Sequence, residues 1–147
     1  MDIDAKIQLL YEGDTKEAYA NLLELDNISE KEDLLYPYLN EFVSMLKSDK
    51  YVVRVRGFRL LCKNAKWDKD NKINQAIDDI LLAVHDEKPT AVRQALLYLK
   101  YVFTYKKELG DNIMKAALSI DCSIFKDTMQ PLIFKDIQNL VQLIDAQ

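Results

Sequence analysis

The sequence predicts an all-α fold, and three observations lead to that prediction. Apolar residues recur at helical spacing along almost the whole chain of 147 residues. Glycine and proline number only three each, fewer than the many turns of a β-sandwich usually require. Residues that typically begin or end helices recur along the chain, and the intervals between them match the usual length of a helix.

The apolar periodicity divides the chain into about eight expected helices with connections of two to about seven residues. We expect helices over residues 2–11, 14–26, 29–47, 51–66, 68–84, 90–109, 111–120 and 128–144.

Local signals set these boundaries. Gly13 and Gly110 are expected to end helices, because glycine tolerates a left-handed cap. Residues 14–17 and 29–32 have the pattern of a capping box and are expected to begin helices. Pro37 cannot donate a backbone hydrogen bond, so the third segment either breaks or kinks there, and we prefer a break.

The cysteines and the histidine argue against several classes of enzyme. Cys62 and Cys122 are sixty positions apart with no CxxC pair, which favours free thiols over a disulfide framework or a zinc site. His85 is the only histidine, and no GxSxG or HExxH motif accompanies it. We therefore expect no catalytic residue, no metal and no cofactor, and a chain that is not an enzyme.

The chain carries no signal of a membrane or secretory protein. Its first residues lack the basic and apolar regions of a signal peptide. Its longest apolar run falls far short of the ~18 residues that a membrane helix needs. A cytoplasmic protein with no membrane partner is the expectation.

An internal repeat of 37 residues is the strongest organisational signal. Aligning Asp49 with Asp86 places similar residues at five further positions: Val55 on Val92, Arg56 on Arg93, Phe58 on Ala95, Leu60 on Leu97 and Lys63 on Lys100. Both copies read Asp, then Val-Arg six and seven positions later, after a helix and a short turn. The alternative is a non-repeating helical bundle with a chance match.

This pattern resembles the HEAT repeat, a helical hairpin of the armadillo type. The turn Asp and the Val-Arg opening of the second helix carry the resemblance, and Pro89 matches a frequent proline of that family, whereas Val52 departs from it. The resemblance implies a right-handed α-α superhelix, an α-solenoid that forms one domain over residues 1–147. Its clearest units are 33–67 and 70–107, with degenerate capping units at 1–26 and 111–147.

Charge is unevenly distributed along the chain, although the net charge is only −4. Residues 1–48 hold 11 acids and 4 bases, residues 49–107 hold 7 acids and 13 bases, and residues 108–147 hold 6 acids and 3 bases. The overall charge therefore conceals a basic centre between two acidic ends.

Cations of the two clearest units fall on stripes of their helices. In HEAT arrays the second helices line the concave face, so the resemblance implies a basic groove there. Its candidate binding residues are Arg56, Arg59, Lys63, Lys66, Arg93, Lys100 and Tyr101.

Structural roles compete with ligand binding at these positions. In HEAT-like turns the Val-Arg arginine often pairs with the turn Asp, which would make ion pairs among Asp49, Arg54, Asp86 and Arg93. The remaining cations could form a solvated helix face.

Two functions fit these observations. The first is a non-enzymatic scaffold that binds an acidic peptide or protein on the basic concave face. The alternative is a HEAT-like protein that binds nucleic acid, or a DNA glycosylase. The sequence pI near 5.0 disfavours this alternative, because duplex binders usually have a strongly basic domain.

Overall fold

The computed structural model describes residues 2–146, and these residues form nine α-helices, six short 3₁₀ turns and no β-strand. The prediction of an all-α fold is confirmed, with nine α-helices where about eight were expected.

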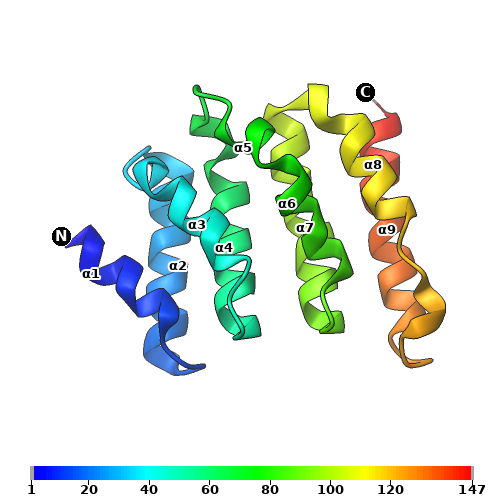
Figure 1. Ribbon diagram of the computed structural model, residues 1–147, viewed down its shortest axis with the longest axis horizontal. Coiled ribbons are helices and arrows are strands. Elements are labelled where there is room, and N and C mark those ends of the chain that lie inside the picture. The colour runs from blue at the N-terminus through cyan, green and yellow to red at the C-terminus, as the bar shows by residue number, and fades with distance from the viewer. Residues whose placement is uncertain (1, 147) are drawn as a thin grey trace.

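Four of the helices form a layer in which all of them run in the same direction (Figure 1). We call it the parallel layer: α2 (Lys16–Lys31), α4 (Tyr51–Lys63), α7 (Pro89–Tyr105) and α9 (Gln130–Asp145). Within it α2 packs on α4, α4 on α7 and α7 on α9. The layer is therefore a row in which each helix touches the next.

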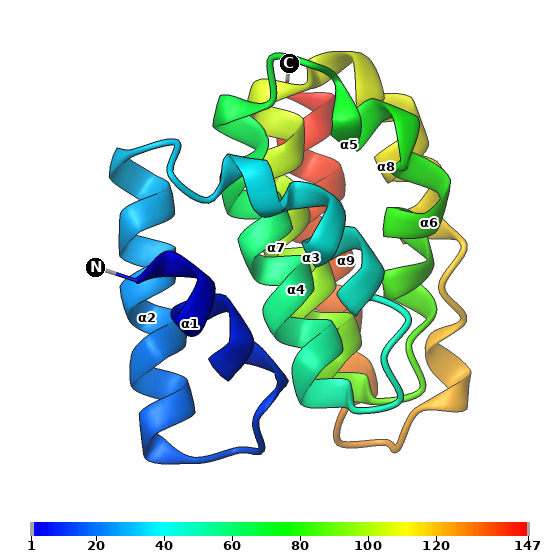
Figure 2. The same cartoon turned by 60° about the vertical axis from the view of Figure 1, so that its left-hand side comes forward.

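Shorter helices cover one side of this row and run in the opposite direction (Figures 1 and 2). We call them the cover layer: α1 (Ile3–Gln8), α3 (Leu39–Met45), α6 (Ile77–Leu81) and α8 (Gly110–Leu118). The small helix α5 (Lys72–Gln75) precedes α6. The 3₁₀ turns are η1 (Leu9–Tyr11), η2 (Tyr36–Tyr38), η3 (Asn64–Trp67), η4 (Leu82–His85), η5 (Lys107–Leu109) and η6 (Cys122–Ile124). Each cover helix and the parallel helix that follows it make one hairpin, so the chain is four hairpins in a row.

The helical spacing of apolar residues builds the core between the layers. On α7 the buried side chains Val92, Ala95, Leu96, Leu99 and Phe103 recur every three or four residues. They belong to a cluster of buried apolar residues that extends from Ile7 on α1 to Leu140 on α9. Adjacent hairpins therefore share one continuous core.

Close contact between α3 and α4 depends on Gly57. A Cβ atom built on Gly57 would lie 2.6 Å from the Cβ of Met45 and 3.0 Å from the carbonyl oxygen of Phe42. The glycine lets the second hairpin close more tightly than any other residue would allow.

Two of the predicted helix boundaries are wrong near the N-terminus. α2 does not end at residue 26, and the capping box expected at residues 29–32 does not begin a helix. Ser29 instead lies inside α2, fully buried, and its hydroxyl donates to the carbonyl of Leu25 at 2.9 Å. Leu25 and Ile28 are buried as well, so tertiary packing continues the helix past the local stop signals.

The expected left-handed glycine caps are also wrong, since no glycine of residues 2–146 has a positive φ. Gly110 begins α8 with φ −54°, and α7 already ends at Tyr105. The chain leaves α7 at Lys106 because that side chain turns into the interior. Pro37 stands in the first turn of η2, so the chain breaks there as preferred.

Every helix in residues 2–146 is too short or too polar to cross a membrane.

Replacing Gly57 by alanine should destabilise the protein. We expect the clash with Met45 and Phe42 to outweigh the gain in helix propensity, lowering the free energy of unfolding by about 1 kcal/mol or more. Gly13→Ala is the matched control, because no atom lies within 4 Å of its added Cβ and φ is not positive. Urea unfolding measures both variants, and equal stabilities would contradict the packing assigned to Gly57.

Candidate functional site

Three of the six cations predicted to line a groove lie on α4, in the middle of the parallel layer: Arg56, Arg59 and Lys63. α4 has α2 on one side and α7 on the other, so its side chains can reach acids and aromatic rings of both neighbours. The two sides supply different partners.

Arg59 and Lys63 of α4 form ion pairs with α2. The Arg59 Nε lies 2.5 Å from a carboxylate oxygen of Asp26, and the Lys63 Nζ lies 3.5 Å from Asp26 and 2.5 Å from Glu30. Burial alone would lower the pKa of Lys63, but the hydrogen bond to Glu30 and the charge of Asp26 outweigh it and raise the pKa. The Lys63 ammonium is thus held charged between α2 and α4.

The other side of the same two cations faces aromatic rings of α7. The Arg59 guanidinium lies 5.3 Å from the ring centre of Tyr98, and the Lys63 ammonium lies 4.4 Å from that of Tyr101. The two tyrosine rings stack on each other at 5.8 Å. Cation–π contacts of this kind favour the charged forms and leave the rings partly covered.

Arg56 points toward the first hairpin instead of a groove. Its side chain is buried, and its guanidinium donates to the carbonyls of Leu10 (3.1 Å), Glu12 (2.5 Å) and Gly13 (3.0 Å). These carbonyls lie at the end of the short η1 turn and just beyond it, and that of Gly13 also accepts from the backbone amide of Thr15 at 3.0 Å. The structure places Arg56 as a cap for the connection between α1 and α2.

The remaining cations of the prediction are placed differently from one another. Arg93 of α7 forms a bidentate pair with Asp136 of α9, at 2.6 and 3.3 Å. The Lys66 ammonium donates to the carbonyl of Glu30 at 2.6 Å. Lys100 is exposed and lies 5.1 Å from the ring of Tyr101, and no carboxylate of residues 2–146 comes within ion-pair distance of it.

The turn residues proposed as structural pairs are linked across hairpins. Arg54 makes a bidentate pair with Asp86, with Nε···O and Nη2···O distances of 2.8 and 3.1 Å. It also donates to the main-chain carbonyls of Ser48 and Asp49. Arg93 binds Asp136, not the turn Asp86. The side chain that joins the two turns is therefore Arg54, which precedes the Val-Arg pair.

The acidic partners of these cations were not identified from the sequence. Asp26 and Glu30 lie in the acidic N-terminal block, Asp136 lies in the acidic C-terminal block, and all three pair with the basic centre. The alternation of acidic, basic and acidic blocks was the signal that could have found them. The alternation of charge reflects ion pairs between hairpins as well as the charge of the surface.

A buried ion pair outside the predicted set joins the second and third hairpins. The side chain of Asp68 is fully buried and lies 3.1 Å from the Lys106 ammonium. Its carboxylate also accepts from the Tyr36 hydroxyl at 2.6 Å and from the backbone amides of Lys72 and Ile73. Every oxygen of this carboxylate has donors, as a buried charge requires.

The thiols offer no activated nucleophile. Burial raises the pKa of Cys62 well above its ordinary value, and burial with the charge of Asp121 raises that of Cys122. Both are therefore thiols at neutral pH. In the part of the chain that the structure describes, no group of three or more His, Cys, Asp or Glu side chains could hold a metal ion.

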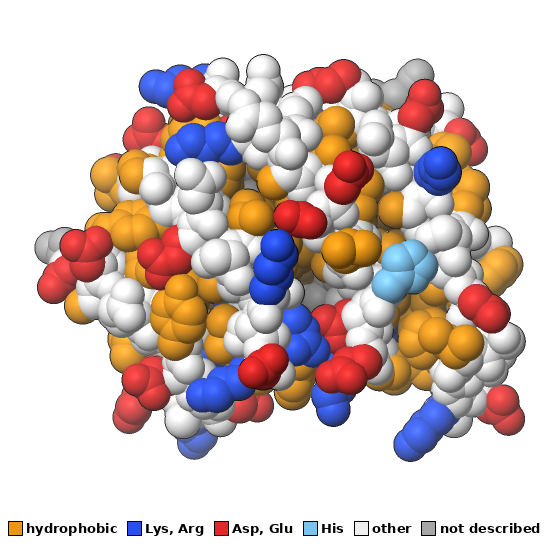
Figure 3. Space-filling view, viewed as in Figure 1, with side chains coloured by type: hydrophobic (Ala, Val, Ile, Leu, Met, Phe, Trp, Pro, Cys, Tyr) orange, Lys and Arg blue, Asp and Glu red, His pale blue; other side chains and the backbone are white. Residues whose placement is uncertain are grey.

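Two of the hollows in residues 2–146 lie on opposite sides of the row. One, of about 100 Å³, lies between α7 and α9; we call it the α7–α9 groove, and it is lined by Leu96, Leu97, Lys100, Asp136, Asn139, Leu140 and Leu143. The other opens on the cover-layer side, where acidic and basic side chains alternate with apolar ones around a central hollow (Figure 3).

Comparison with known proteins gives no match to a family model, a curated protein or a solved structure.

Arg56→Lys should lower stability without removing a charge. The ammonium group of lysine cannot donate to three carbonyls as the planar guanidinium group does. We therefore expect a loss of about 1–3 kcal/mol in the free energy of unfolding. Lys100→Met removes an exposed cation and should change stability by less than about 0.5 kcal/mol. If urea unfolding gave the two variants equal stabilities, Arg56 would not be a structural cap.

Acid should destabilise the protein partly through Asp68. Burial alone would raise its pKa, but hydrogen bonds from Tyr36, from two backbone amides and from Lys106 outweigh burial and lower the pKa below its ordinary 3.8. A lowered folded-state pKa stabilises the fold above pH 3.8, and this stability is lost as pH falls through the folded value.

Urea titrations between pH 4 and pH 2 measure this contribution. The wild type should lose up to about 1.4 kcal/mol more per pH unit than Asp68→Asn, which has no proton to bind. Identical slopes would show that folding leaves the pKa of the Asp68 carboxyl unchanged, which would contradict its lowered value.

Proposed function

We propose that this chain is a non-enzymatic, HEAT-like interaction module that binds an acidic segment of a partner protein in the α7–α9 groove. Four hairpins in a row, with their second helices parallel and adjacent, support an α-solenoid. The repeat of 37 residues supports the same arrangement, because Asp49 and Asp86 precede two of those second helices.

Lys100 is the observation that carries the proposal. The other predicted groove cations on α4 and α7 bind acids or carbonyls of the chain itself, whereas Lys100, which lines the α7–α9 groove, is exposed and pairs with no carboxylate of residues 2–146. An ammonium group without a carboxylate partner attracts an anion, and the attraction is screened by salt.

Apolar surface beside Lys100 gives the groove a second kind of contact. Leu97 is 47% exposed, and Leu143 lies across the groove from it on α9. On the same helix, the ring of Tyr101 lies 5.1 Å from the Lys100 ammonium. Tyrosine and leucine next to a single cation suit a peptide that combines an acidic residue with an apolar one.

The ion pairs weigh against a groove for duplex nucleic acid. Binding of this kind depends on several cations that neutralise phosphates together. Arg59, Lys63 and Arg93 already neutralise acids of the chain, so a phosphate backbone would have to displace those acids.

Reversing the charge of Lys100 tests the proposal. The immobilised wild type is used to capture proteins from an extract of its own cells at low salt, followed by elution at high salt. We expect an acidic protein that elutes with salt, and at least a fivefold loss of it with Lys100→Glu, because the reversed charge repels the segment.

Lys115→Glu is the matched control, since Lys115 is exposed on α8 in the cover layer. It should capture as the wild type does, and both variants should keep the wild-type thermal midpoint. Capture that nuclease removes, or capture that Lys100→Glu leaves intact, would contradict the proposal.

A further inference from the structure

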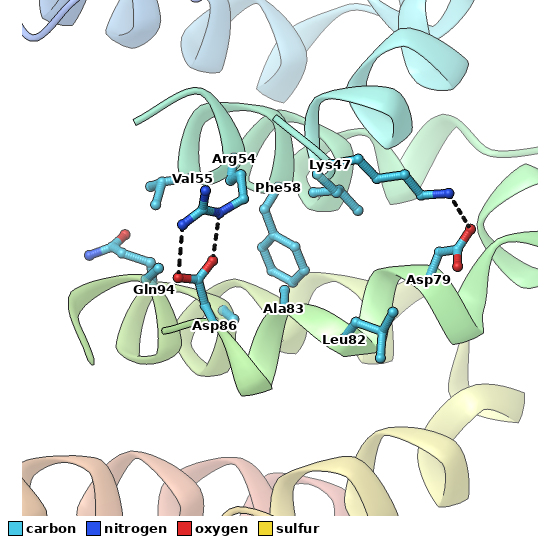
Figure 4. Close-up of a pocket in the computed structure, with 12 residues that line it drawn as sticks. Lys47, Arg54, Val55, Phe58, Asp79, Leu82, Ala83, Asp86 and Gln94 are labelled. Atoms are coloured by element: carbon cyan, nitrogen blue, oxygen red, sulfur yellow. Dashed lines mark hydrogen bonds and ion pairs between the residues drawn. The ribbon is translucent and has the colours of Figure 1, made fainter. Parts of the chain in front are cut away.

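The cover-layer side contains a second hollow with different chemistry. It lies between the second hairpin (α3 and α4) and the third (α6, η4 and α7), and we call it the hairpin slot. Its apolar lining comes from both hairpins: Leu46, Val55, Phe58, Leu82, Ala83 and Ala95. Figure 4 shows Phe58 and Ala83 in the middle of the slot, with charged side chains toward its two ends.

The size of the slot limits what it can hold. Its volume is about 100 Å³, and an apolar cavity of roughly 150 Å³ is enough to bind benzene. The slot therefore admits a branched aliphatic side chain of four carbons and excludes an indole ring. Leu82 is 63% exposed at the slot, so an occupant would cover apolar surface that now faces water.

The two ends of the slot differ in how firmly their charges are paired. At one end Arg54 holds Asp86 in a bidentate pair (Figure 4). Beside that pair, Glu87 is 78% exposed and lies 3.8 Å from Arg54. At the other end, Asp79 is half exposed and lies 3.7 Å from the exposed Lys47 (Figure 4).

Glu87 and Asp79 are thus carboxylates whose cation contacts are longer than a hydrogen bond. An incoming cation can approach either of them without breaking a close pair. Among the slot residues taken together with Glu87, the exposed charged side chains are the carboxylates Asp79 and Glu87 and the cation Lys47.

The spacing of these carboxylates sets the form of the occupant. Eight residues of α-helix, 3₁₀ turn and loop separate Asp79 from Glu87, a span of roughly 12–15 Å. In an extended chain, residues i, i+2 and i+4 point to the same side and cover about 13 Å. An extended segment can therefore place a central side chain in the slot and one flanking side chain near each carboxylate.

We propose that the hairpin slot binds an extended segment of a partner protein in which an aliphatic residue is flanked, two positions away on each side, by lysine or arginine. The aliphatic side chain fills the apolar slot, and the two cations pair with Asp79 and Glu87. This site lies on the opposite side of the row from the α7–α9 groove and takes a segment of opposite charge, so it does not depend on the function proposed above.

Synthetic peptides test the proposal directly on the full chain. The probe is the acetylated, amidated heptapeptide Ser-Arg-Ser-Leu-Ser-Arg-Ser, titrated at low salt into ¹⁵N-labelled protein. We expect shifts concentrated at Ala83, Gln94 and neighbouring slot residues. The peptide with alanine for leucine should bind at least about tenfold more weakly. The peptide with glutamate for both arginines should bind about fivefold more weakly, and salt should remove that difference.

Protein variants locate the binding. Ala83→Leu fills the slot and should abolish the shifts, whereas Ala20→Leu, on the exposed side of α2, should not. Asp79→Asn combined with Glu87→Gln should remove the preference for arginine over glutamate. The control combination, Asp127→Asn with Glu17→Gln, changes two exposed carboxylates elsewhere and should retain it.

Several results would overturn the proposal. They are absence of shifts at millimolar peptide, equal binding of the arginine and glutamate peptides, and shifts centred on the α7–α9 groove. Self-association in sedimentation experiments that Ala83→Leu abolishes would assign the slot to a second copy of the chain. If Ala83→Leu fails to fold, the peptide series on the wild type still decides the question.

Discussion

The structure depends on how one central helix satisfies its own positive charges. α4 carries Arg54, Arg56, Arg59 and Lys63, and these four side chains reach the turn before α7, the connection between α1 and α2, and two acids of α2. A cation that is largely buried must be paired, and these pairs exist only when neighbouring hairpins are correctly placed. Packing of apolar residues brings the hairpins together, and the cations of α4 specify their relative position.

The same pairs explain the alternation of charge along the chain. The acidic block before α4 and the acidic block after α7 supply partners to the basic block between them, as Asp26 does for Arg59 and Asp136 does for Arg93. The solvent-exposed surface of the central block is therefore less basic than the sequence of that block implies. For this reason we propose that an anionic segment binds around Lys100 and not along the whole basic groove expected from the sequence.

Periodicity predicted the all-α class and the long helices α4, α7 and α9, because their apolar stripes repeat over several turns. It failed where tertiary contacts override local signals. α2 continues through Ser29, since Leu25 and Ile28 are buried, and α7 ends early at Lys106, since that ammonium reaches Asp68. The break at Ala76 between α5 and α6 has no local signal in the sequence.

Candidate site residues could be placed on helix faces but not assigned partners. The sequence placed Arg56, Arg59 and Lys63 on one stripe of one helix, yet Arg56 reaches η1 while the other two reach α2. Side-chain direction at the ends of a stripe depends on which acids and carbonyls the neighbouring hairpin presents. A single sequence contains that information only as the complementary charge of distant segments.

A double-mutant cycle on Asp26 and Arg59 tests the central claim most directly. Urea unfolding of Asp26→Asn, of Arg59→Gln and of the double variant gives the coupling free energy between α2 and α4. If α4 positions its neighbours through its cations, the coupling should be about 1–3 kcal/mol in favour of the intact pair. A coupling near zero would contradict the account, because it would show that Arg59 and Asp26 meet without contributing to the assembly of the hairpins.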